Sequence, residues 1–137
     1  MSGSTTATGP DANAPGPVGV RVLVVDDEAA IRDLLSKTLA LAEYDVDMAP
    51  DGRTALERLR IIPYDLLITD LKMPGVDGLS VIREARRLKA DLPVIIITGF
   101  SNEASAIEAV NLGVSGYLTK PFRVPRVLAA AAKALGE

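Results

Sequence analysis

The chain of 137 residues contains no cysteine and no histidine. The lack of cysteine excludes disulfides, thiolate catalysis and zinc sites built on sulfur ligands. The lack of histidine excludes Ser-His and Cys-His catalysis and imidazole metal ligands, and it means that this chain cannot itself carry a phosphohistidine.

Aromatic residues make up only 4% of the chain, whereas 48% of its residues are hydrophobic and 24% are charged. This balance is typical of a soluble protein with an aliphatic core, and the length fits one domain. No stretch approaches the ~20 consecutive apolar residues that a bilayer-spanning helix needs, so we expect no membrane association. The formal net charge of -3 argues against direct binding of nucleic acid, which normally requires a basic excess.

The first nineteen residues consist mainly of small residues, glycine and proline, and they show no apolar periodicity. We therefore expect a flexible tail or linker at 1–19 and one folded domain at 20–137. The tail has neither the basic start nor the apolar run of a secretory signal. A cytoplasmic protein is the resulting expectation.

Short apolar runs alternate with amphipathic stretches along the rest of the chain. The runs that predict strands are 21–25, 66–69 and 94–98, with weaker candidates at 45–49, nearer an edge, and at 116–119. Between the first two strands, one helical face is marked by Ile31, Leu34, Leu35, Thr38 and Leu39. Further helices are predicted at 52–60, 78–88, 102–112 and 125–135.

The predicted helix 102–112 has a small apolar set, namely Ala106, Ile107, Val110 and Leu112. We therefore expect it to pack loosely, which would suit an element with two positions.

The strand-helix unit occurs five times, and right-handed crossovers then give a parallel sheet with helices on both faces. Five strands in a chain this short favour a flavodoxin-like doubly wound (βα)5 three-layer sandwich, with strand order 2-1-3-4-5. A dinucleotide-binding fold fits less well, because the first strand-helix turn reads DDEAA and lacks glycine. In the favoured order, ligands bind at the carboxyl ends of strands 1 and 3.

Polar residues stand at these carboxyl ends. They are Asp26, Asp27 and Glu28 after the first strand, Asp70 after the third, Thr98 at the end of the fourth and Lys120 after the fifth. Carboxylates this close raise one another's pKa unless a cation lies among them, and Mg2+ prefers such oxygen ligands.

Together these groups could perform phosphoryl transfer. Asp70 is the best candidate for the nucleophile, Asp26 and Asp27 are better placed to hold the ion, and the Lys120 ammonium would neutralise phosphoryl oxygens. Each residue also has a simpler reading. Asp27 or Glu28 could cap the next helix, and Asp70 could form a turn. Because all of these polar residues are expected at the same edge of one sheet, a role in phosphoryl transfer is favoured over these separate structural roles.

Four motifs resemble the receiver domain of two-component response regulators, chemotaxis regulators among them. They read VLVVDDE, DLLITDLKMPGVDGL, PVIIITGF and GYLTKPF, and they extend over essentially everything after the tail. The resemblance implies that Asp70 accepts a phosphoryl group from a phosphohistidine on a sensor kinase or phosphotransfer protein. It implies a signalling domain whose only reactions are Mg2+-dependent self-phosphorylation and autodephosphorylation.

The resemblance also assigns roles around the site. Asp27 and Asp70 would bind Mg2+, which Mn2+ could replace, with Asp26 acting mainly through water and the backbone carbonyl of Lys72 completing the protein ligands. Thr98 and Lys120 match the phosphate-contacting pair. The Lys120-Pro121 peptide bond matches one that is cis in the family, and Lys72 and Phe100 border the approach of the attacking water.

Tyr117 matches the aromatic switch position of the family. On phosphorylation, Thr98 would move toward the phosphoryl group and Tyr117 would turn inward, which reshapes the face formed by 102–112, 116–119 and 125–135. That face would control a downstream protein or an output domain, and a homodimer through it is an open alternative. The alternative is that Tyr117 is an ordinary half-buried aromatic residue on an edge strand, with no role in switching.

Two questions stay open at this stage. The chain is either a complete single-domain regulator or a receiver from a longer protein. An aspartate-nucleophile phosphatase for small phosphoesters is the alternative from another class. Such enzymes usually need a second aspartate two residues after the first, where this chain has Lys72.

Overall fold

A computed structural model describes residues 19–99 and 102–136. The predicted tail, apart from Gly19, and Phe100 lie outside the described residues. The strands are β1 (Arg21–Val25), β2 (Asp45–Ala49), β3 (Leu66–Thr69), β4 (Val94–Thr98) and β5 (Gly116–Thr119). The helices are α1 (Ala29–Leu41), α2 (Gly52–Ile61), α3 (Gly78–Leu88), α4 (Glu103–Asn111) and α5 (Val124–Ala134).

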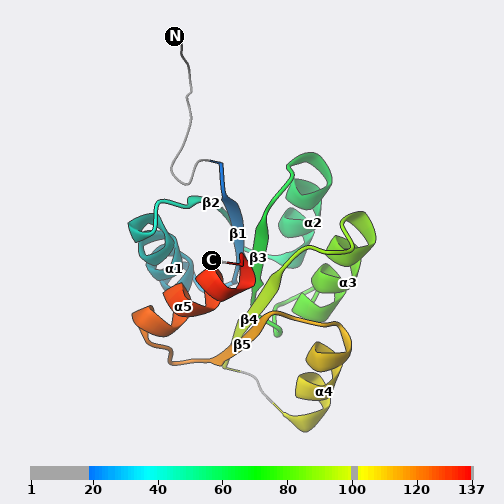
Figure 1. The fold of residues 1–137 in the computed structure, drawn as a ribbon. Helices are drawn as coiled ribbons and strands as arrows, with labels where there is room; N and C mark the ends of the chain where they lie inside the picture. Colours follow the sequence, from blue (N-terminus) through cyan, green and yellow to red (C-terminus); the bar gives the residue numbers. More distant parts are fainter. Residues whose placement is uncertain (1–18, 100–101, 137) are drawn as a thin grey trace.

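The five strands form one parallel sheet in the order β2-β1-β3-β4-β5 (Figure 1). The predicted flavodoxin-like topology is confirmed, and β2 lies at an edge, as its weaker apolar pattern indicated. β1 and β3 are neighbours, with Val25 opposite Thr69. The residues that follow these two strands, Asp26 and Asp70, therefore leave the sheet side by side.

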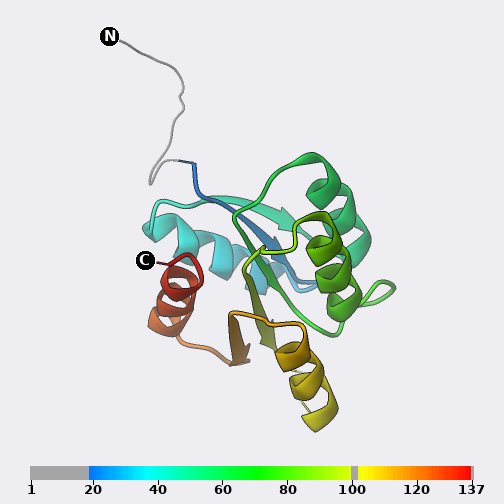
Figure 2. The ribbon, with the colours of Figure 1, turned by 45° about the vertical axis from the view of Figure 1, so that its right-hand side comes forward.

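Helices cover both faces of the sheet, which confirms the three predicted layers (Figure 2). One apolar cluster joins alternate strand residues such as Leu23 and Leu67 to α2 and α3. A second joins the intervening residues, such as Val24 and Ile68, to α1 and α5. The central strands are buried on both faces, which is why their sequences are continuously apolar. No helix among the described residues is long and apolar enough to cross a membrane.

Side-chain caps fix the starts of three helices. Asp51 accepts a hydrogen bond from the Thr54 amide at the start of α2, and Asp77 accepts one from Ser80 at the start of α3. At α4, Asn102 and Ser105 form a reciprocal capping box. Each cap satisfies an amide that the first helical turn leaves without a partner. These helices consequently begin within one residue of the predicted positions.

Two of the four residues in the apolar set of the predicted helix 102–112 do not pack against the core. Ile107 and Val110 are 54% and 76% exposed, and Ser105 and Ala109 are the buried residues of this helix. The helix contacts the core through small side chains, and the spacing of its large apolar residues does not predict this contact face. In α1, likewise, Leu34 is exposed although it belongs to the predicted face.

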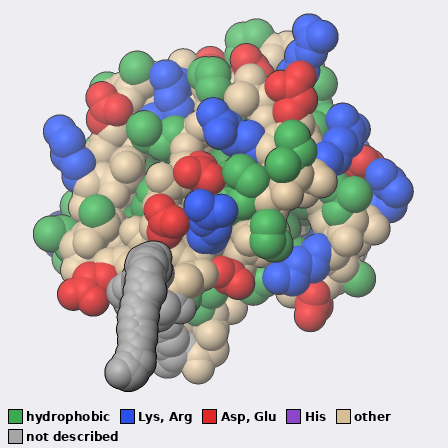
Figure 3. Space-filling view, turned by 90° about the horizontal axis from the view of Figure 1, so that it is seen from above, with side chains coloured by type: hydrophobic (Ala, Val, Ile, Leu, Met, Phe, Trp, Pro, Cys, Tyr) green, Lys and Arg blue, Asp and Glu red, His purple; other side chains and the backbone are tan. Residues whose placement is uncertain are grey.

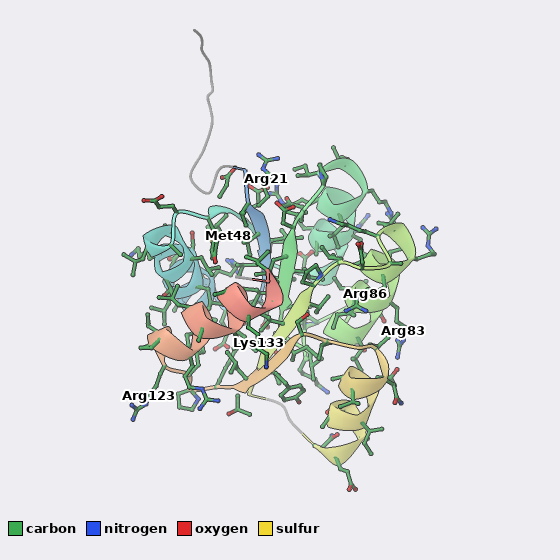
Figure 4. All side chains as sticks on the ribbon, viewed as in Figure 1. Arg21, Met48, Arg83, Arg86, Arg123 and Lys133 are labelled. Atoms are coloured by element: carbon green, nitrogen blue, oxygen red, sulfur yellow. The ribbon has the colours of Figure 1, made fainter. Side chains whose placement is uncertain are left out.

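Polar contacts from α3 hold α4 in place (Figure 4). The Arg86 guanidinium donates hydrogen bonds to the carbonyl oxygens of Leu112 at 2.6 Å and Gly113 at 3.0 Å, just past the end of α4. Arg83 pairs with Glu108 on α4 at 2.9 Å. α4 itself buries only Ser105 and Ala109, so these contacts add to a small packing surface.

Candidate functional site

Residues from four strands meet at the carboxyl edge of the sheet, the lower edge in Figure 1. The structure brings together Asp26 after β1, Asp70 after β3 and Lys120 after β5. Thr98 is fully buried at the end of β4, and its carbonyl oxygen accepts a hydrogen bond from the Lys120 amide at 2.9 Å. This backbone bond fixes the position at which Lys120 leaves the sheet.

Three carboxylates form a compact acidic cluster here. Asp26, Asp27 and Asp70 each offer an oxygen, and these oxygens all lie within 4.8 Å of one another. Asp26 and Asp70 are buried, whereas Asp27 is exposed. Hard oxygen donors with one solvent-facing member suit Mg2+, which binds a few carboxylates and keeps several waters. The cluster is therefore a candidate metal site.

The ammonium of Lys120 is shared among the carboxylates. Its Nζ atom lies 2.8 Å from both Asp26 Oδ2 and Asp70 Oδ2, and 2.9 Å from Glu28 Oε1. Burial alone would lower the pKa of Lys120, but the hydrogen bonds to Asp26, Asp70 and Glu28 outweigh burial and raise it. Lys120 is therefore a permanent cation at this site.

The Asp70 side chain is held in one orientation by the backbone. Its Oδ1 atom accepts hydrogen bonds from the amides of Leu71 at 2.6 Å and Lys72 at 3.4 Å. Oδ2 is left to face Lys120. Asp70 thus forms a local turn, as the simpler reading proposed, and it also presents one oxygen to the ammonium, so the two readings are compatible.

Asp26 is held equally firmly. Its Oδ1 atom accepts a hydrogen bond from the Glu28 amide at 2.9 Å, and its backbone carbonyl accepts one from Arg32 at 2.6 Å. Burial is the main cause that raises the pKa of Asp26, although the bond from Lys120 acts in the opposite direction. Burial thus disfavours the ionised form of Asp26, and the neighbouring Lys120 ammonium offsets part of this effect.

The simpler reading, in which an acidic side chain caps the next helix, does not hold for Glu28. Glu28 is the N-cap residue of α1, but its side chain accepts no capping bond. Its carboxylate reaches Lys120 instead. This partnership joins residues 92 positions apart in the chain, so no local pattern could have revealed it.

The remaining predicted residues lie around this cluster. Tyr117 is half-buried on β5 opposite Ile96, and it packs against the apolar cluster that includes α2 and α3. Lys72 is exposed next to Asp70, and the Lys120-Pro121 peptide bond is cis, as expected.

Gly78 is a residue that the sequence reasoning missed. A Cβ atom at this position would collide with the Asp70 carbonyl oxygen. The Gly78 amide donates a hydrogen bond to the Leu71 carbonyl at 2.9 Å, so the start of α3 is drawn against the Asp70 turn. The quoted motif DLLITDLKMPGVDGL contains this glycine, and its proximity to Asp70 was the available signal.

A family model for the response regulator receiver domain matches residues 22–132. Response regulator MprA of Mycolicibacterium vanbaalenii is 37% identical over 110 residues, which are 80% of this chain and 48% of MprA. MprA of Mycobacterium ulcerans is 38% identical over 112 residues, or 82% of this chain and 48% of that protein. The chain thus spans about half the length of these relatives.

Solved structures agree with the sequence relatives. Chemotaxis protein CheY4 of Vibrio cholerae superposes with a TM-score of 0.79 and 31% identity, covering 85% of this chain and 98% of CheY4. A CheY-like receiver domain protein of Methanospirillum hungatei gives a TM-score of 0.82 and 26% identity, covering 85% and 94% of the two chains. The chain belongs to the response regulator receiver domain family of two-component signalling.

Proposed function

We propose that Asp70 is the phosphoacceptor of this receiver. The observation that carries the proposal is the position of Asp70 Oδ2, which lies 2.8 Å from the Lys120 ammonium. Asp26 and Asp27 complete the acidic cluster beside it. A carboxylate nucleophile next to a fixed cation and a candidate metal site has the parts that phosphoryl transfer requires.

The acidic cluster fits Mg2+ or Mn2+ as the resident cofactor. Asp26, Asp27 and Asp70 would hold the ion together with the backbone carbonyl of Lys72. The three carboxylates supply hard oxygen donors, and Asp27 stands open to solvent. When bound, the ion neutralises charge on the oxygens of the transferring group.

The phosphodonor is a phosphohistidine on a sensor kinase or phosphotransfer protein. Asp70 Oδ2 attacks phosphorus, and the O–P bond forms as the N–P bond breaks. The ring nitrogen keeps the electron pair of the broken bond, and because the other ring nitrogen carries a proton, the histidine leaves as neutral imidazole. Lys120 then stabilises a phosphoryl oxygen, with the Thr98 hydroxyl as a further donor. Autodephosphorylation adds water to phosphorus and returns the free carboxylate, inorganic phosphate and a proton. Lys72 and Phe100 border the approach of that water.

The signal passes to the face formed by α4, β5 and α5. Thr98 moves toward the phosphoryl group, and Tyr117 turns into the space that it leaves. Two observations support this path: the backbone bond between Thr98 and Lys120, and the small number of side chains that α4 buries, namely Ser105 and Ala109. The switched face acts on a downstream protein or output domain, or on a second copy of the chain.

Residues 20–137 are proposed as the receiver unit, and the cytoplasm as its location, because the phosphodonor kinases act there. The MprA relatives are about twice as long as the matched segment, so a separate output domain in the whole protein is part of the proposal. A phosphatase acting on small phosphoesters is not favoured, because the position two residues after Asp70 holds Lys72 and offers no carboxyl proton donor.

The test is incubation with acetyl phosphate and Mg2+ followed by intact mass spectrometry. One phosphoryl group that is labile to base is expected, and it should map to Asp70. Asp70→Asn should abolish labelling. The matched control is Asp91→Asn, which changes an exposed aspartate in the α3–β4 loop and should label normally.

Two results would contradict the proposal. One is equal labelling of the Asp70→Asn variant. The other is labelling that continues at the same rate after all divalent ions have been chelated. Steady turnover of a small phosphoester would instead support the phosphatase alternative.

A further inference from the structure

A second surface lies at the amino edge of the sheet, opposite Asp70. There, the carboxyl ends of α2 and α3 and the loops that follow them enclose a groove of about 340 Å3. Leu59 of α2 and Ala85 of α3 contribute apolar walls, and Leu92 closes one end. The groove is remote from every residue placed in the phosphorylation site.

Two large apolar side chains on the groove are exposed to solvent. Ile61, at the end of α2, is 80% exposed, and Leu88, at the end of α3, is 42% exposed. Isolated exposed apolar residues are ordinary, but two that line one concave apolar surface form a contiguous patch, which is typical of a binding site. The groove therefore resembles an interface that lacks its partner.

Basic residues surround this patch. The segments that line or flank the groove, 59–64 and 85–92, hold four Lys and Arg residues and one acidic residue, Asp91, although the whole chain has a net charge of -3. Figure 3 looks down on this edge, and Lys and Arg side chains are frequent over its right-hand side, where α2 and α3 lie. The surface is thus a basic island on an acidic protein.

Some of these cations already have partners. Glu84 pairs with Arg87 at 2.7 Å and more distantly with Arg60 at 3.5 Å. Lys89 donates a hydrogen bond to the Tyr64 carbonyl at 3.2 Å, and it has no carboxylate partner among the described residues. The rim of the groove therefore keeps an excess of positive charge.

Helix dipoles explain part of this pattern. Basic residues in the last turns of α2 and α3 stabilise the negative ends of those helices. The dipoles do not explain why Ile61 and Leu88 stand exposed among these cations. An apolar groove with a basic rim is complementary to a partner that presents apolar side chains flanked by carboxylates.

We propose that this groove docks an acidic amphipathic segment of a partner protein. Apolar side chains of the segment would contact Ile61 and Leu88, and its carboxylates would face Arg60 and Lys89. Charge complementarity would steer the encounter, and apolar burial would supply the affinity. Because Asp70 lies at the opposite edge, such a partner can remain bound while Asp70 is phosphorylated.

The probe is a fluorescent helical peptide with leucine at positions i, i+3, i+4 and i+7 and glutamate elsewhere. Binding is measured by anisotropy, and the contacted residues are mapped by amide chemical shifts on the full chain. Saturable binding with shifts confined to 59–64 and 85–92 is expected. The double variant Ile61→Ser/Leu88→Ser should raise Kd at least tenfold, and Arg60→Gln/Lys89→Gln should raise it and weaken its dependence on salt.

The controls separate the two contributions to binding. Leu41→Ser changes an exposed leucine of α1, on the other face of the sheet, and should leave Kd unchanged. Peptides with serine in place of leucine, or lysine in place of glutamate, should bind at least tenfold more weakly. Urea unfolding of each variant confirms that it is folded.

Several results would overturn the proposal. They are no saturable binding at millimolar peptide, shifts that map elsewhere, or a Kd unaffected by the Ile61→Ser/Leu88→Ser change. Tighter binding of a DNA duplex or of phosphatidylglycerol vesicles than of the peptide would also overturn it. The assay involves no phosphorylation, so its outcome is independent of the role of Asp70.

Discussion

Replacement of Lys120 by methionine tests the electrostatics of the phosphorylation site most directly. The substitution keeps the apolar stem but removes the ammonium that lies 2.8 Å from both Asp26 and Asp70. The side chains of these two aspartates are only 2% and 6% exposed. Without Lys120 they would be neighbouring buried charges of the same sign.

The expected loss of stability follows from this burial. Removal of one partner from a buried ion pair typically costs about 3–5 kcal/mol, because the other charge is left uncompensated. The contact to Glu28 adds little, since that side chain is 61% exposed and exposed pairs contribute ~0–1 kcal/mol. We expect a loss of about 3 kcal/mol, at the lower end because the cluster opens to solvent at Asp27.

Urea unfolding without divalent ions measures this loss, and the same titration in millimolar Mg2+ tests its cause. If repulsion between Asp26 and Asp70 is responsible, Mg2+ should stabilise the Lys120→Met variant more than the parent protein. The substitution Asp70→Asn should also be less damaging in the Lys120→Met background than in the parent protein. The exposed Lys133→Met serves as the control and should change stability by less than about 0.5 kcal/mol.

The reasoning would be refuted by a loss below 1 kcal/mol together with an equal response of both proteins to Mg2+. That result would mean that water screens the carboxylates despite their burial.

Three further predictions concern other parts of the molecule. Gly78→Ala should destabilise the protein by about 3 kcal/mol and slow the labelling of Asp70, because the new Cβ atom would meet the Asp70 carbonyl oxygen; unchanged melting would contradict the tight packing. Arg86→Met should cost about 2 kcal/mol and increase hydrogen exchange in α4 more than in α1, because the carbonyl oxygens of Leu112 and Gly113 lose their donor; uniform exchange would argue against this attachment. The hydrogen bond from Arg87 lowers the pKa of Glu84 to about 2, so the stability from this pair should be complete above the ordinary glutamate pKa and disappear as pH falls through about 2. Carboxyl NMR titration should give that midpoint, Arg87→Gln should raise it, and a midpoint near 4 in the parent protein would contradict the pairing.

The sheet was predictable because its buried strands are composed almost entirely of apolar residues. Strands β1, β3 and β4 are covered on both faces, so apart from Arg21 and the terminal threonines they consist of apolar residues. Once strand order followed from the alternation of elements, the meeting of Asp26, Asp70 and Lys120 at one edge followed as well.

The features that escaped prediction depend on neighbours distant in sequence. α4 buries Ser105 and Ala109 and leaves Ile107 and Val110 exposed, and the apolar pattern of the helix does not predict this orientation. The attachment by Arg86 depends on carbonyl groups 26 and 27 residues away. Glu28 stands at the N-cap position of α1, but its carboxylate accepts a hydrogen bond from Lys120, which is distant in the sequence.

The contribution of Lys120 from β5 has a consequence for the order of events in the cell. β5 is the last strand in sequence and lies at an edge of the sheet, so ribosomes release Asp26 and Asp70 long before the lysine that neutralises them. Until β5 is added, Asp26 and Asp70 lack the ammonium that lies between them in the complete fold. Completion of the last strand would thus stabilise the fold and supply the reactive cation in a single step.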